Sequence, residues 1–187
     1  MPDNQPEWVV CDGGPHLLLP TELVPCWEGV SEPSNGRIVQ ARFRYLGKES
    51  SATDYDLACD VEEEIGLIPV GAGYGLVIGQ AVPMSIWIPL PESRGGVIAV
   101  PMFWDCNVTA VLPSSNFKDA EFVPTKLVIS TESGTFTLLA ASDCGPKWVY
   151  PHSVITVTAG TYAISKANYS VPDFEARLYR LLPILGT

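Results

Sequence analysis

Acidic side chains are concentrated in one short stretch of the chain. Seven carboxylates fall within residues 49–64, which contain no Lys or Arg: Glu49, Asp54, Asp56, Asp60, Glu62, Glu63 and Glu64. Such a run is most often a solvated face. It could also supply paired acids for hydrolysis, although these need a cleft and an opposing group. A third use is a surface that steers a basic partner into contact.

Thiol and imidazole groups are the other candidates for chemistry. The chain has two histidines and five cysteines, and none of them has the H-x-x-x-H or C-x-x-C spacing of a metal site. The sequence therefore predicts no metal and no cofactor. The odd number of cysteines favours reduced thiols in a cytoplasmic protein. Cys11, beside a Gly-Gly pair, and His16 leave a small cytoplasmic hydrolase or thiol enzyme as an alternative.

The acidic stretch needs an element to position it. Thr53 can cap a short helix near residues 53–60, with Asp54 and Asp56 favourably placed in its first turn. Before it, residues 37–46 alternate apolar and polar side chains, which predicts a half-exposed strand. Trp27, between proline breakers, is expected to anchor a loop on the core.

Glycine-rich turns between apolar runs predict hairpins. They are expected at residues 8–19 around Gly13-Gly14, and at 65–79, 127–139 and 154–169. The tail at 174–182 fits either a helix or a strand, and its alternation favours the strand. The predicted fold class is α+β, predominantly β, with antiparallel sheets built from successive hairpins, one or two short helices and two packed lobes.

Composition and charge set further limits. The 187 residues are 47% hydrophobic, only 17% charged and rich in Gly and Pro, which is typical of a globular chain of short strands. The net charge is -10, and most of it lies in the first half, which disfavours binding to nucleic acid or a membrane surface. We expect an acidic lobe at 1–92 and a β-sandwich-like lobe at 93–187, or one continuous domain. The N-terminus lacks signal-peptide features, and no apolar run could cross a membrane.

Several short motifs together resemble one known family. In order along the chain they are Trp8-Val9, Gly13-Gly14-Pro15, Leu17-Leu18-Leu19-Pro20, Pro25-Cys26-Trp27-Glu28-Gly29 and Thr53-Asp54-Tyr55-Asp56. In this arrangement the chain resembles the Imm21 immunity proteins, which belong to bacterial polymorphic toxin systems. The match is densest over residues 8–90. It departs from the family pattern at Asp12 and Leu57.

The resemblance implies a non-enzymatic, cytoplasmic protein that binds and neutralises one cognate toxin domain. We expect a basic toxin, with a nuclease as one option, whose active site is occluded. From the charge pattern, the candidate toxin-binding residues are Asp54, Asp56, Asp60, Glu62, Glu63 and Glu64. The alternatives are the hydrolase or thiol enzyme and a structural or ligand-binding β-module of the host cell.

Overall fold

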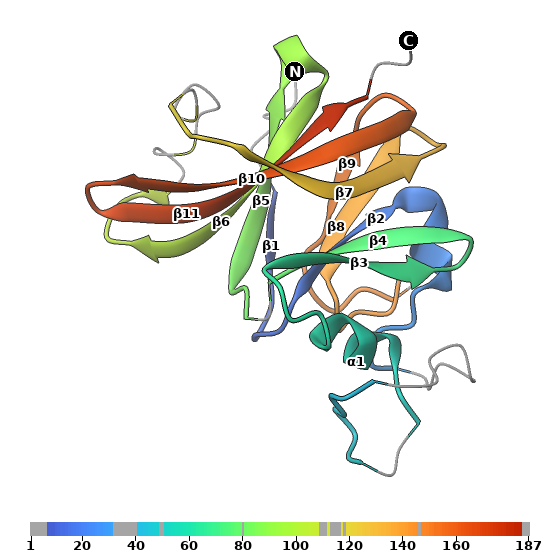
Figure 1. The fold of residues 1–187 in the computed structure, drawn as a ribbon. Helices are drawn as coiled ribbons and strands as arrows, with labels where there is room; N and C mark the ends of the chain where they lie inside the picture. Colours follow the sequence, from blue (N-terminus) through green and yellow to red (C-terminus); the bar gives the residue numbers. More distant parts are fainter. Residues whose placement is uncertain are drawn as a thin grey trace.

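The structure, a computed structural model, is mostly β. It describes residues 7–31, 41–48, 51–79, 81–108, 112, 117, 119–145 and 147–184. Two antiparallel sheets pack together, and only short helices accompany them, so the predicted fold class is confirmed (Figure 1). The helices named within the described residues are α1 (Asp54–Cys59) and the 3-10 helices η1 (Thr21–Cys26) and η2 (Pro91–Ser93).

Each sheet mixes strands from distant parts of the chain. The six-stranded sheet has the order β1 (Trp8–Val10), β5 (Met84–Leu90), β6 (Gly95–Trp104), β11 (Phe174–Pro183), β10 (Gly160–Val171) and β7 (Val123–Thr131). The five-stranded sheet has the order β3 (Ile65–Val70), β4 (Gly73–Ile78), β2 (His16–Pro20), β8 (Thr135–Ala140) and β9 (Ser153–Thr156). Both sheets combine strands from either side of residue 92.

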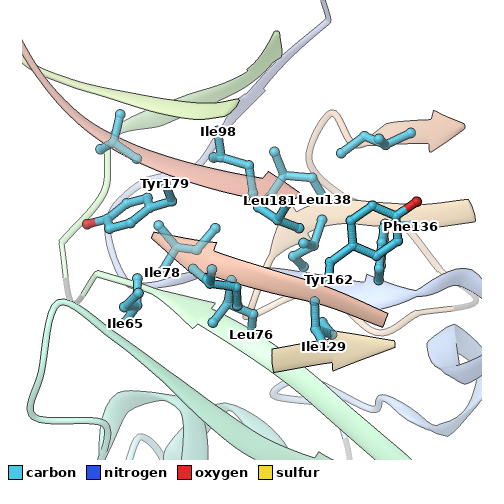
Figure 2. Packing of buried hydrophobic residues seen from close by; sticks show 14 of the residues in the cluster. Ile65, Leu76, Ile78, Ile98, Ile129, Phe136, Leu138, Tyr162, Tyr179 and Leu181 are labelled. Atoms are coloured by element: carbon cyan, nitrogen blue, oxygen red, sulfur yellow. The ribbon is translucent and has the colours of Figure 1, made fainter. Parts of the chain in front are cut away.

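Three clusters of buried apolar side chains hold the structure together, one between the sheets and one on the outer face of each sheet. The inner core lies between the sheets, and Figure 2 shows Leu76 and Ile78 of β4 packed against Tyr179 and Leu181 of β11. A second cluster joins the outer face of the five-stranded sheet to η1, Trp27 and α1. A third covers the outer face of the six-stranded sheet. Alternate strand residues therefore point into different cores, as the pleat requires.

Local pattern predicts the strands well but not all of their pairings. The hairpin at 65–79 is confirmed, since β3 pairs with β4 from Ile65↔Ile78 to Val70↔Gly73. The strand at 174–182 is confirmed as β11. Trp27 is the predicted anchor, buried and donating its Nε1–H to the Ala141 carbonyl oxygen at 3.0 Å.

Three of the predicted hairpins, at 8–19, 127–139 and 154–169, are wrong. In each case the turn carries the chain from one sheet to the other, so β1, β7 and β10 lie in the six-stranded sheet while β2, β8 and β9 lie in the five-stranded one. The reason is burial: all five residues of β2 are buried, which a central strand between β4 and β8 provides. A glycine turn closes a hairpin or a corner between layers equally well.

The predicted strand at 37–46 is also wrong over its described part. Residues 41–46 form no strand, and residues 37–40 lie outside the described part of the chain. Backbone N–H groups here donate to carboxylates of the helical segment instead of to a neighbouring strand. Side-chain acceptors therefore replace the sheet ladder.

The corner between β1 and β2 contains two glycines with positive φ, one with open space around it and one packed against a side chain. Gly13 has φ +112° with nothing within 4 Å of an added Cβ, whereas Gly14 has φ +104° and its Cβ would lie 2.5 Å from the Tyr55 hydroxyl. Both backbones disfavour any L side chain. We expect Gly13→Ala to lower the free energy of unfolding by about 1–3 kcal/mol. Gly14→Ala should cost clearly more, because Tyr55 must also move.

Urea denaturation of the two variants beside the unchanged protein measures this difference. Equal losses of stability for Gly13→Ala and Gly14→Ala would show that Tyr55 yields freely, and would contradict close packing of the helix against the corner.

Candidate functional site

The first turn of α1 buries two of the predicted carboxylates. Thr53 caps the helix by accepting the Asp56 N–H at 3.1 Å, and Asp56 Oδ2 accepts the Thr53 N–H at 2.7 Å, which completes a capping box. Asp54 Oδ2 accepts the Glu28 N–H at 2.8 Å. Asp54 is 2% exposed and Asp56 0%. Both carboxylates therefore serve as buried hydrogen-bond acceptors.

Asp56 and Asp60 also fix the segment at residues 41–48, which we call the aromatic loop. Asp56 Oδ1 accepts the Tyr45 N–H at 2.7 Å, and Asp60 Oδ1 accepts the Phe43 N–H at 2.7 Å. The second Asp60 oxygen accepts the N–H of Arg42. Hydrogen bonds to carboxylates are among the stronger ones in proteins. The loop backbone is therefore held against the helix by charge-assisted bonds.

Ion pairing accounts for two more of the predicted acids. Glu62 pairs with the Arg42 guanidinium at the surface. Glu64 pairs with Lys166 Nζ at 3.0 Å and with Arg177 Nε at 3.2 Å, which ties the start of β3 to the six-stranded sheet. Glu63 is exposed and has no ion pair or hydrogen bond to any described residue. The six acids thus have different surroundings and do not form one uniform charged face.

Aromatic side chains complete the surface around α1. Tyr55 makes edge-to-face contacts with Phe43 at a centroid distance of 6.1 Å and with Tyr45 at 5.6 Å. Burial raises the Tyr55 pKa, with a further contribution from the Cys59 thiol, so the ring stays a neutral phenol. Sequence reasoning missed Phe43, Tyr45 and Leu46 as site residues. Their signal was an alternation with arginines, which also fits a strand face.

The structure also brings Cys11 and His16 together. Cys11 Sγ lies 3.3 Å from His16 Nε2, and His16 Nδ1 lies 2.6 Å from Ser85 Oγ. Burial raises the pKa of the Cys11 thiol and lowers the His16 pKa to about 4. Both groups are therefore neutral at pH 7. A nucleophilic cysteine needs a lowered pKa, so this arrangement fits a buried polar link between the sheets, not a catalytic pair.

Metal-binding clusters and membrane-spanning helices are both absent from the described part of the chain. No group of three or more His, Cys, Asp or Glu side chains there could hold a metal ion. Among the same residues, no helix has the length and apolar character that crossing a membrane requires.

The lowered pKa of His16 makes stability depend on pH. In the unfolded chain His16 takes up a proton near pH 6.5, whereas in the folded protein it does so only near pH 4. The unfolded state therefore binds more protons between these values, and stability falls as the pH drops through this window. We expect His16→Gln, which keeps polar contacts but does not titrate, to lose about 2 kcal/mol less than the unchanged protein between pH 7 and 4.5.

Urea unfolding of both proteins at the two pH values gives this difference, and the carboxylates that titrate in both cancel. Equal losses of stability in the two proteins would mean that His16 takes up its proton at the same pH in the folded and unfolded states, contrary to its burial.

Among known proteins, the chain is similar to one family. No curated protein and no solved structure matches the chain. The family model described as "Immunity protein 21" matches residues 7–173, which include α1, the aromatic loop, the five-stranded sheet and every strand of the six-stranded sheet except β11. Members of this family are non-enzymatic inhibitors of toxins. The chain belongs to the Imm21 family of immunity proteins.

Proposed function

We propose that the protein acts in the cytoplasm by binding a cognate toxin domain and occluding its active site. Membership of the Imm21 family over residues 7–173 is the observation that carries this proposal. The toxin is a basic protein, with a nuclease as one option, because the net charge of -10 favours a cationic partner.

The six predicted acids take different parts in this proposal. Glu63 is exposed and can attract a basic surface over several ångströms before contact, whereas Glu62 is exposed but pairs with Arg42. Asp60 and Glu64 are partly exposed and already paired within the chain. Asp54 and Asp56 are buried, so their contribution to binding is through the structure of the helix that presents the others.

Growth rescue tests the function itself. The C-terminal domain of the toxin encoded beside this chain is induced in a sensitive host, with and without co-expression of the chain. Restored growth is the expected result. Failure of rescue, with both proteins present in soluble form, would overturn the immunity proposal.

Charge reversal tests steering. We expect Glu63→Lys to lower the association rate constant for the toxin domain by about two- to tenfold at low salt, with the difference vanishing at high salt. Stopped-flow measurements at several ionic strengths give these rates. Glu92→Lys is the matched control, since Glu92 is an exposed acid in η2, outside the acidic stretch.

An association rate that does not depend on salt in the unchanged protein would contradict the electrostatic part of the proposal. Equal effects of Glu63→Lys and Glu92→Lys would also contradict it, because the position of the charge would then make no difference to the association rate.

A further inference from the structure

We infer that the aromatic loop is the principal contact surface for the toxin, and that Asp56 and Asp60 position it. This inference rests on the proposed function and assigns it a site. The occupant is the basic toxin domain, which would receive the loop's apolar side chains in an apolar pocket.

Exposure of large apolar groups is the first observation. Phe43 is 41% exposed, and Tyr45 and Leu46 are each 58% exposed, all within four consecutive residues. Scattered apolar residues are normal on a surface, but a group of this kind beside polar residues marks an interaction site. Aromatic side chains are also the residues that most often dominate the energy of protein interfaces.

The rigid presentation of these groups is the second observation. Carboxylates of Asp56 and Asp60 hold the loop's N–H groups at 2.7 Å, and the Arg44 guanidinium donates back to the Phe43 carbonyl oxygen at 2.9 Å. Tyr55 supports the rings from below through edge-to-face contacts. A loop ordered before binding loses less conformational entropy on association. This arrangement therefore suits a tight inhibitor.

Charge selects the occupant of this surface. The exposed acids Glu62 and Glu63 follow the helix that supports the loop, and in Figure 1 the loop is the cyan trace below α1. A second copy of this chain would bring identical acids face to face, and each copy carries a net charge of -10. The loop itself carries Arg42, Arg44 and Lys48, and Glu62 pairs with Arg42, so the net charge of the whole chain and the exposed Glu63 are what favour a basic toxin domain.

Three kinds of residue then have three kinetic signatures. Contact residues, namely Phe43, Tyr45 and Leu46, determine how slowly the complex dissociates. Steering residues change the association rate in a salt-dependent way. Substitution of a positioning residue such as Asp60 weakens binding even at high salt, because the disturbance of the loop persists when the change in charge is screened.

The contact role is tested with the full-length chain and the purified toxin domain. We expect Phe43→Ala/Tyr45→Ala to raise the dissociation rate constant at least 100-fold, and Leu46→Ala at least tenfold, measured by biolayer interferometry. The melting temperature should stay close to that of the unchanged protein, because these side chains are exposed. Tyr74→Ala is the matched control, since Tyr74 is equally exposed, at 58%, on β4.

The positioning role is tested at Asp60. We expect Asp60→Ala to speed amide hydrogen exchange at Arg42 and Phe43 in the free protein and to weaken binding about tenfold, a loss that persists at high salt where the removed charge is screened. Asp60→Asn keeps one acceptor oxygen and should restore part of the protection and part of the affinity.

The outcomes separate this inference from the proposed function. If the unchanged protein neither binds the toxin domain nor rescues growth, the function fails. If it does both, and the loop variants dissociate no faster than Tyr74→Ala, the toxin binds elsewhere and only the assignment of the loop is overturned. Unaltered amide exchange in Asp60→Ala would remove the positioning role alone.

Discussion

The burial of β2 on both faces is the constraint on which the rest of the structure depends. Leu18 points into the inner core, while Leu17 and Leu19 belong to the outer cluster. Fully burying each such side chain stabilises the fold by about 1.5–3 kcal/mol, but only if the outer face of the sheet is covered. Trp27, η1 and α1 form that cover. The place of α1, and so of everything attached to it, follows from this requirement.

Next to that cover, carboxylates accept hydrogen bonds from backbone N–H groups of the aromatic loop. A surface segment without a strand partner must still satisfy its N–H groups. Here Asp56 meets this need twice, since one oxygen closes the capping box and the other accepts the Tyr45 N–H. A single buried side chain thus couples the start of the helix to the loop beside it. Acidity in this stretch reflects local backbone needs as well as the attraction of a partner.

Sequence reasoning succeeded where one residue's chemistry decides the local structure. The Thr53 cap predicts α1, and the alternation at 174–182 predicts β11, because each depends on neighbours along the chain. Pairing partners are different. Gly14 and Gly134 both have positive φ, at +104° and +72°, which also suits a hairpin turn. Each of their turns instead leads from one sheet to the other, because the burial of β2 and β8 decides where those strands lie. The loop at 41–48 was missed because its acceptors, Asp56 and Asp60, lie beyond it in the sequence.

The strand orders contain one further regularity. The succession β1, β2, β4, β5, β6 is repeated by β7, β8, β9, β10, β11, and exchanging the two sets leaves the order of the six-stranded sheet unchanged. The strand order is therefore symmetric about the antiparallel pairs β2–β8 and β6–β11. The five-stranded sheet departs from this symmetry only through β3. That strand, α1 and the aromatic loop all fall between β2 and β4, whereas the described part of 141–152 holds no strand or helix. The scaffold consists of two sets of strands in the same order that complete each other's sheets, and the segment between β2 and β4 can change its surface without disturbing this symmetric framework.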